Sequence, residues 1–174
     1  LMTAQIANGG YKISPKIIVN NKPLNFLEAK KNMELRSSID PNLKLIKDKK
    51  NLEIVQKAMF SSTNEIRGTS YRSRIDDPKY QFAGKTGTAQ VKRISKRERE
   101  LDLKIEQIPY NDRDHALYVA YGPYVNPRYA ISIIVEHGGS GSKAAAPMAK
   151  ELFKLIIDRD GLREKQSNFE EIDI

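Results

Sequence analysis

Near the middle of the chain lies the octapeptide Ala83-Gly84-Lys85-Thr86-Gly87-Thr88-Ala89-Gln90, which predicts the edge of a β-sheet that can hold an extended peptide. Lys85 offers a compact positive charge for a substrate carboxylate. Thr86 adds a hydroxyl that can donate to the same group, and Gly87 lets a second backbone come close. A peptide would pair with this segment as an added strand, with Lys85 setting its polarity. The predicted role is a substrate cradle, without a nucleophile.

Gly84-Lys85-Thr86 also matches the last three positions of G-x-x-x-x-G-K-[ST], the pattern of a phosphate-binding loop. That pattern requires a glycine at position 79, where this chain has Lys79. The phosphate-loop interpretation is therefore rejected. A bare Lys-Thr-Gly triplet is a weak motif match, so its meaning depends on the elements around it.

Length and charge place the chain among basic globular domains. It has 174 residues, of which 39% are hydrophobic and 30% charged, as expected of one domain. The net charge of +8 favours an anionic neighbour such as a membrane surface, a cell-wall polymer or nucleic acid. The densest basic run, at 92–99, is poor in aromatic residues, so we interpret it as a solvated loop and predict no nucleic-acid partner.

Cysteine is absent, which excludes disulfides and thiolate chemistry. The two histidines, His115 and His137, lie far apart in sequence, so no metal site is predicted. We expect His115 to be a structural or surface group and His137 to be a turn residue. The sequence contains no apolar run long enough to span a membrane and does not begin like a signal peptide. We therefore expect any membrane anchor to lie outside this chain.

The first half of the chain is predicted to contain both helix and strand. Residues 1–7 are typical of the end of a helix that stops at Asn8-Gly9-Gly10. A short strand is predicted at 15–19 and a turn at 20–23, followed by a weakly patterned, irregular connection over 24–50 with one short element.

A helix is predicted next, with Asp48 or Asn51 as its N-cap and Gly68 at its end. Its apolar positions, predicted to pack in the core, are Leu52, Ile54, Val55, Ala58, Met59 and Ile66. Residues 69–80 are predicted to form a loop that leads into the strand of Lys85.

The second half predicts an antiparallel sheet covered by helices, an α/β fold of the α+β kind. The strand of Lys85 is followed by a charged connection over 92–110 and by strands at 116–121 and 129–136. Glycines at 138–142 are interpreted as a sharp turn, with anion binding by free N–H groups as the alternative. A final helix is predicted from Ala144, with Pro147 in its first turn, and residues 158–174 are predicted to form a frayed tail.

Several local phrases, in this order, match one family. The chain resembles the C-terminal part of a penicillin-binding transpeptidase domain from residue 1 to about residue 157, most closely in the penicillin-binding protein 2 branch. The matching phrases are Ile6-Ala7-Asn8-Gly9-Gly10, Gly68-Thr69, the octapeptide around Lys85, Asp114-His115-Ala116-Leu117, Val135-Glu136-His137-Gly138-Gly139 and Ala145-Ala146-Pro147.

The resemblance implies a fold shared with serine β-lactamases and a defined chemistry. In that family, the serine of a Ser-x-x-Lys motif attacks a D-Ala-D-Ala stem peptide and forms an acyl-enzyme that an amine then converts into a crosslink. By this resemblance, Lys85 and Thr86 hold the terminal carboxylate, Gly87 keeps the edge open, and the N–H of Thr88 is an oxyanion-hole donor. Neither a cofactor nor a metal is implied.

The family places its Ser-x-x-Lys and Ser-x-Asn motifs before the segment where this chain begins. Residues 1–174 are therefore expected to be a partial transpeptidase domain that contains no catalytic residue and is inactive alone. Ser62-Thr63-Asn64 does match Ser-x-Asn, but it lies on the predicted helix. We interpret these residues as polar side chains on the helix surface, without a catalytic role.

The implied partners are peptidoglycan stem peptides, β-lactams and membrane proteins of the elongation machinery, at the periplasmic face of the inner membrane. The 92–110 connection would overhang the site or meet partner proteins. An exposed apolar seam is expected to cause self-association. A β-lactamase-like or penicillin-sensing domain remains the alternative, although the Ala89-Gln90 continuation and the long connection favour the transpeptidase.

Overall fold

The computed structural model describes residues 1–15, 39–92 and 103–170, with backbone alone at 39–42 and 162–170. The predicted strand at 15–19 and turn at 20–23 lie outside these residues, apart from residue 15. Helix α1 (Met2–Ala7) confirms the predicted helix end. Asn8 is its C-cap residue, and the Asn8 side chain closes the following turn by accepting hydrogen bonds from the N–H groups of Gly10 and Tyr11, at 3.1 and 3.0 Å.

A two-stranded sheet follows α1. Strand β1 (Tyr11–Ile13) pairs antiparallel with β2 (Ile39–Lys44). Residues 24–38 of the predicted connection lie outside the described residues, and β2 is the one short element that the sequence allowed in it. The pairing of β1 with β2 was not predicted, because β1 and β2 offer little local alternation and form through a contact between distant segments.

Helix α3 (Lys49–Asn64) begins where the sequence predicted. Its N-cap is Asp48, whose carboxylate accepts from the N–H of Lys50 at 2.8 Å. The helix ends at Asn64, and Ile66, expected in the core, lies beyond it with 83% of its surface exposed. Of the other positions predicted in the core, Leu52 and Met59 are buried, whereas Ile54, Val55 and Ala58 are exposed.

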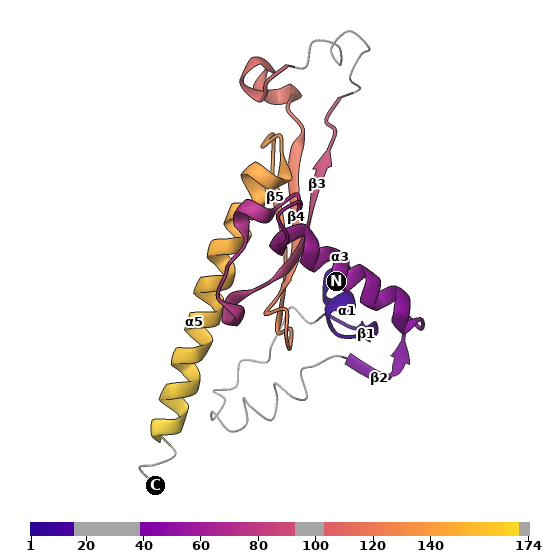
Figure 1. The fold of residues 1–174 in the computed structure, drawn as a ribbon, viewed down its shortest axis with the longest axis vertical. Coiled ribbons are helices and arrows are strands. Elements are labelled where there is room, and N and C mark those ends of the chain that lie inside the picture. Colours follow the sequence, from indigo (N-terminus) through magenta and orange to yellow (C-terminus); the bar gives the residue numbers. More distant parts are fainter. Residues whose placement is uncertain (16–38, 93–102, 171–174) are drawn as a thin grey trace.

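The main sheet has the predicted antiparallel arrangement, with strand order β3-β4-β5 (Figure 1). Its strands are β3 (Ala83–Ala89), β4 (His115–Gly122) and β5 (Tyr129–Val135). Before β3, the predicted loop at 69–80 carries the short helices η1 (Tyr71–Ser73) and η2 (Pro78–Tyr80). The register places Lys85 opposite Val119 and Thr86 opposite Tyr118. This sheet confirms the predicted fold class.

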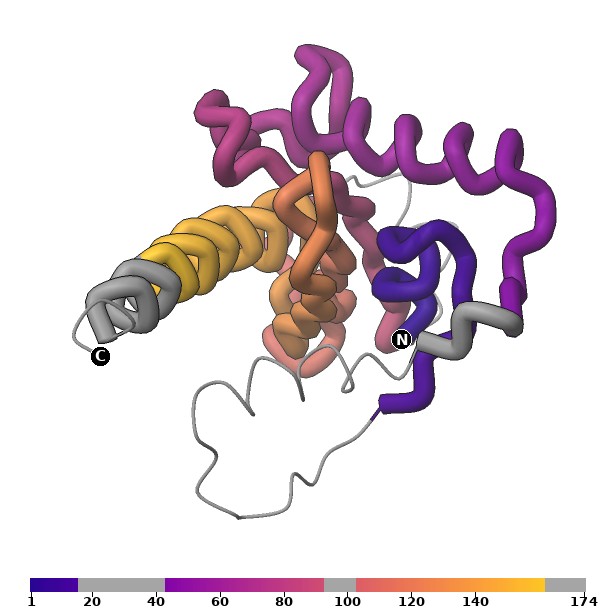
Figure 2. Tube along the Cα trace, turned by 90° about the horizontal axis from the view of Figure 1, so that it is seen from below, coloured from indigo at the N-terminus to yellow at the C-terminus, as the bar shows by residue number. Residues whose placement is uncertain are grey.

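Helices pack on both sides of the sheet, and the view from below shows α3 and α5 leaving it in different directions (Figure 2). Alternate β4 residues, among them Tyr118, pack with Phe153 of α5 in the larger core cluster. Phe153 stacks on Phe82 with ring centroids 4.8 Å apart. A smaller cluster joins Met59 of α3 to Ala83 and Tyr121. The two clusters fix β3 and β4 from both faces.

The last helix has a π-helical first turn, η5 (Gly141–Ala145), and continues as α5 (Ala146–Glu170) with Pro147 in its first turn. Its backbone is still helical over 158–170, where the sequence predicted a frayed tail.

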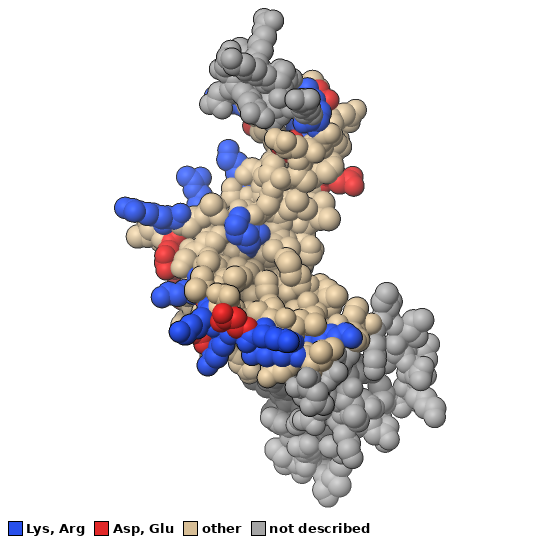
Figure 3. Space-filling view, turned by 90° about the vertical axis from the view of Figure 1, so that its right-hand side faces the viewer, with Lys and Arg blue, Asp and Glu red and all other residues tan. Residues whose placement is uncertain are grey.

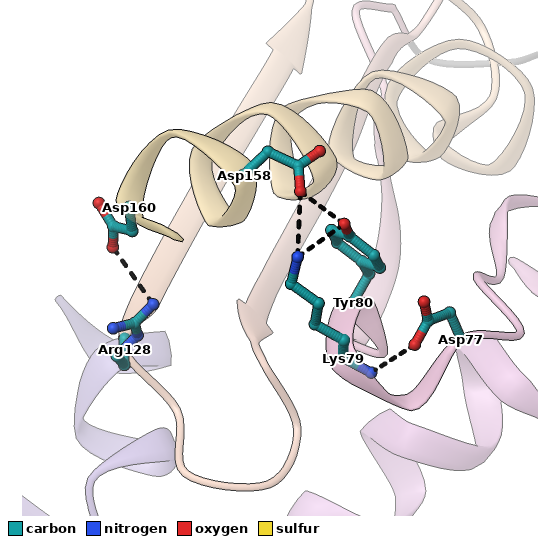
Figure 4. A network of polar contacts seen from close by, with 6 residues as sticks. All are labelled: Asp77, Lys79, Tyr80, Arg128, Asp158 and Asp160. Carbon is teal, nitrogen blue, oxygen red and sulfur yellow. Dashed lines mark hydrogen bonds and ion pairs between the residues drawn. The ribbon is translucent and has the colours of Figure 1, made fainter. Parts of the chain in front are cut away.

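A surface network holds α5 against two preceding turns (Figure 4). Asp158 accepts a hydrogen bond from the Tyr80 hydroxyl and lies 3.2 Å from the Lys79 ammonium, while Arg128 lies 3.4 Å from Asp160. The Tyr80 hydroxyl and then Lys79 hold the pKa of Asp158 below its usual value. These contacts hold the turn of α5 that carries Asp158 and Asp160 against the two preceding segments.

Basic side chains outnumber acidic ones on the face of the molecule that carries α3 (Figure 3). Lys49, Lys50 and Lys57 are exposed there, and Lys49 pairs with Glu53 at 3.5 Å. Within the described part of the chain, no helix combines the length and apolarity needed to span a membrane.

η3 (Ile105–Gln107) and η4 (Tyr110–Asp112) lie in the connection before β4. The rest of the predicted 92–110 connection, residues 93–102, lies outside the described residues.

Candidate functional site

The Lys-Thr-Gly sequence lies on an edge strand. Among the described residues, β3 pairs only with β4, so its other edge carries main-chain groups without a partner strand. An edge of this kind accepts an extended peptide as an additional strand. The strand therefore has the edge position that the sequence predicted for this motif.

Lys85 is exposed on this edge. Its ammonium donates to the carbonyl oxygen of Thr86 at 2.8 Å, which keeps the charge close to the strand. None of the described carboxylates forms an ion pair with it. The charge of Lys85 is thus available to an anion.

The other predicted site residues lie along the same strand. Thr86 is half-buried, and its hydroxyl lies 3.3 Å from the hydroxyl of Thr69. Gly87 is half-buried opposite Leu117, and Thr88 is exposed opposite Ala116. The structure therefore brings Lys85, Thr86, Gly87 and Thr88 together on β3 and adds Thr69, which sequence analysis did not assign to the site.

A cluster of buried hydroxyl groups, those of Thr63, Ser70 and Tyr118, lies against β3. Tyr118 Oη lies 2.9 Å from Thr63 Oγ1 and 3.1 Å from Ser70 Oγ. A Cβ on Gly84 would lie 2.2 Å from Tyr118 Oη, so only glycine lets the tyrosine reach its partners. Burial raises the pKa of Tyr118, against the opposing effect of the hydrogen bonds with Ser70 and Thr63. The cluster ties β4 to the segment that carries Thr69.

Tyr118 and Tyr121 lie on the same strand, and we expect loss of their hydroxyl groups to change the free energy of unfolding in opposite directions. Tyr121 Oη is buried, and no hydrogen-bond partner lies near it within the described residues. Replacing Tyr121 with phenylalanine is expected to stabilise the protein by about 1 kcal/mol, because it removes an unsatisfied polar group. Tyr118→Phe is expected to destabilise it by about 1–2 kcal/mol, since Thr63 and Ser70 lose a partner. Urea unfolding of both variants measures the difference, and equal shifts of the same sign would contradict it.

The Ser-x-Asn match on α3 has a structural role. Asn64 Nδ2 donates to the carbonyl oxygens of Phe60 and Phe82, at 3.1 and 2.9 Å. The amide therefore ties the end of α3 to the start of β3. The structure supports a non-catalytic interpretation of Ser62-Thr63-Asn64, although Thr63 is buried and not on the surface as expected.

One segment has the spacing of the Ser-x-x-Lys motif, although the chain is expected to contain no catalytic residue. It is Ser140-Gly141-Ser142-Lys143, at the start of η5. Ser140 Oγ has Ser142 Oγ as its partner, at 3.0 Å, while Lys143 is exposed. A nucleophile needs a base within hydrogen-bond reach, and this serine is paired with another hydroxyl. We interpret the match as a coincidence of spacing.

The two histidines meet although they are distant in sequence. Their ring centroids lie 4.8 Å apart, and the N–H of His137 donates to His115 Nδ1 at 3.0 Å. His137 is the predicted turn residue, with φ of +54°. Residues 1–15, 39–92 and 103–170 contain no cluster of three or more histidine, cysteine or acidic residues that could hold a metal ion.

The glycine-rich turn after β5 uses its N–H groups internally. Gly138 N–H donates to Val135 O, Gly139 N–H to Asp114 O and Ser140 N–H to Gly138 O. These bonds occupy the N–H groups of residues 138–140, which favours the turn interpretation over anion binding.

Comparison with known proteins identifies the chain. The family model described as "Penicillin binding protein transpeptidase domain" matches residues 2–154. The chain belongs to this transpeptidase family. Peptidoglycan D,D-transpeptidase MrdA of Salmonella typhimurium is 37% identical over 105 residues, 60% of this chain and 16% of the relative. That of Acinetobacter baumannii is 32% identical over 155 residues, 88% of this chain and 21% of the relative.

Solved transpeptidase structures agree. Penicillin-binding protein 2 of Pseudomonas aeruginosa, in complex with WCK 5153, matches with a TM-score of 0.59 and 30% identity, over 88% of this chain and 28% of that one. Penicillin-binding protein 2 of Helicobacter pylori, in complex with MreC, matches with a TM-score of 0.59 and 28% identity, over 90% of this chain and 23% of that one. These matches confirm the predicted resemblance to the penicillin-binding protein 2 branch.

Proposed function

We propose that this chain supplies the substrate-binding strand of a peptidoglycan D,D-transpeptidase. The supporting observation is the exposed Lys85 ammonium, which lies 2.8 Å from the carbonyl oxygen of Thr86 on the free edge of β3, in a chain of this family. A stem peptide ending in D-Ala-D-Ala lies along β3, and Lys85 and Thr86 hold its carboxylate. Gly87 keeps the strand edge open, and the N–H of Thr88 donates to the oxyanion.

The strand positions the substrate for a serine supplied by the remainder of the protein. That serine attacks the carbonyl of the penultimate D-alanine, the terminal D-alanine leaves with a proton, and an acyl-enzyme remains. An amine from another stem peptide then displaces the serine and forms the crosslink. A β-lactam carries the same carboxylate and stops at the acyl stage. We expect the chain alone to bind such ligands without becoming acylated.

Covalent labelling tests this proposal against its alternative, a β-lactamase-like or penicillin-sensing domain. The full-length protein that carries this chain is incubated with a fluorescent penicillin, and the adduct is followed by gel electrophoresis. A transpeptidase is expected to retain the label for many minutes, because its acyl-enzyme excludes an activated water. Release within seconds would assign the protein to the hydrolytic alternative, and a stable label without crosslinking of stem peptides would assign it to a sensor.

The proposed setting is the periplasmic face of the inner membrane, with membrane proteins of the elongation machinery as partners. The relative from Helicobacter pylori has been solved in complex with MreC, which supports a partner of this kind. The connection after β3 is the proposed contact surface or overhang. Its two described ends are tied to each other by Lys92 and Asp112, 2.9 Å apart, and by the N–H of Val91, which donates to Asp114.

A further inference from the structure

A row of hydroxyl groups leads from α3 to the proposed carboxylate site. Ser62 Oγ lies 3.0 Å from Thr69 Oγ1, which lies 3.3 Å from Thr86 Oγ1. Ser62 lies in the last turn of α3, Thr69 in the turn that follows, and Thr86 on β3. The contacts therefore join three segments of the chain at the exposed edge of the sheet.

The turn that carries Thr69 is held in place on both sides of it. A Cβ on Gly68 would lie 2.3 Å from the carbonyl oxygen of Ser62, so the turn can pass there only as glycine. Ser70 donates to the same carbonyl twice, from its N–H at 2.9 Å and its hydroxyl at 3.0 Å. Ser70 Oγ also contacts the buried Tyr118 Oη. Thr69 is thus presented to β3 by a turn whose neighbours cannot move freely.

The number of hydrogens available on the three hydroxyl groups fixes which group donates to which. Each hydroxyl donates one hydrogen, and a carboxylate can only accept. When Thr86 donates to a carboxylate, its oxygen must accept from Thr69, and Thr69 must accept in turn from Ser62. All three dipoles then point toward the anion, and each hydrogen bond strengthens the next.

We propose that Thr69 is a positioning residue, which accepts from Ser62 and directs the Thr86 hydroxyl proton toward the substrate carboxylate. This inference rests on the proposed function of Lys85 and Thr86. Thr86 is then held at two atoms, with Lys85 on its carbonyl oxygen at 2.8 Å and Thr69 on its hydroxyl. Without Thr69, the Thr86 hydroxyl rotates freely and must be ordered by the ligand itself.

The test measures affinity for two peptides in the full-length protein. One probe is a stem-peptide analogue that ends in D-Ala-D-Ala with a free carboxylate, and the other is the same peptide ending in a carboxamide. Thr69→Val removes the hydroxyl while keeping the side-chain shape. Affinity for the carboxylate peptide is expected to fall about fivefold, with affinity for the carboxamide unchanged. Thr69→Ser keeps the hydroxyl and is expected to retain the wild-type preference.

The outcomes separate this inference from the proposal beneath it. A Thr69→Val protein that keeps the wild-type preference for the carboxylate overturns the role of Thr69 and leaves the Lys85 clamp standing. A wild-type protein that binds both peptides equally overturns the clamp itself. Ser62→Ala provides a second variant if Thr69→Val fails to fold. It is expected to lower the same preference by a smaller factor, and an equal loss for both peptides would contradict the inference.

Discussion

Replacing Lys85 with methionine is expected to slow acylation of the full-length protein by a fluorescent penicillin about a hundredfold. Methionine keeps an unbranched side chain of similar length and removes the charge. A hydrogen bond to a charged group contributes about 1.5–3 kcal/mol, and each 1.4 kcal/mol changes a rate tenfold. Because Lys85 is exposed and pairs with no described carboxylate, its loss should leave the folded state intact.

The second-order rate constant of acylation, taken from the time course of labelling, measures this effect. Lys57→Met is the matched control, since Lys57 is also exposed but lies on α3, and it should acylate at the wild-type rate. A Lys85→Met protein that labels as fast as this control would show that the edge of β3 does not hold the carboxylate. A lower melting temperature for Lys85→Met alone would instead indicate a structural role.

Gly84→Ala is expected to lower the free energy of unfolding by about 3 kcal/mol. The added Cβ would lie 2.2 Å from Tyr118 Oη, which is far inside van der Waals contact. Tyr118 is completely buried, and moving its ring would break its hydrogen bonds with Thr63 and Ser70. Steric strain and the loss of hydrogen bonds therefore both destabilise the Gly84→Ala variant. Neither effect is expected when alanine replaces an exposed glycine.

Urea unfolding followed by circular dichroism measures this loss. Gly161→Ala is the matched control because no atom lies within 4 Å of its added Cβ and the residue lies inside α5. That substitution should stabilise the helix by up to about 1 kcal/mol. If both alanine variants unfold at the same urea concentration, the close approach of Tyr118 to β3 does not limit the residue at position 84.

Strands β3, β4 and β5 could be predicted because their signals are local. Alternating apolar residues and flanking turn residues predicted β4 and β5, and the Lys-Thr-Gly pattern predicted an edge for β3. The end of α3 could not be predicted as well, because a tertiary contact acts there. Asn64 bonds to the carbonyl of Phe82, 18 residues away, and the helix stops, which leaves Ile66 in solvent.

The site shows the same division. Lys85 and Thr86 are adjacent and form a motif, so the sequence predicted them together. Thr69 lies 17 residues before Thr86, and no period or motif of the residues alone links the two. The Gly68-Thr69 phrase in the family resemblance was the one available signal. Conversely, Ser140 and Lys143 have the spacing of a catalytic pair, but their geometry makes no catalytic contact, since Ser140 bonds to Ser142.

The open side of β3 also carries a hazard. A strand with unsatisfied main-chain groups is a template for pairing with any other extended chain, including another molecule of the same protein. A lysine at the middle of such a strand opposes that, because two copies that add edge to edge bring their like charges together. Lys85 is therefore expected to oppose aggregation through this edge, and in the proposed function the carboxylate of the stem peptide neutralises that charge.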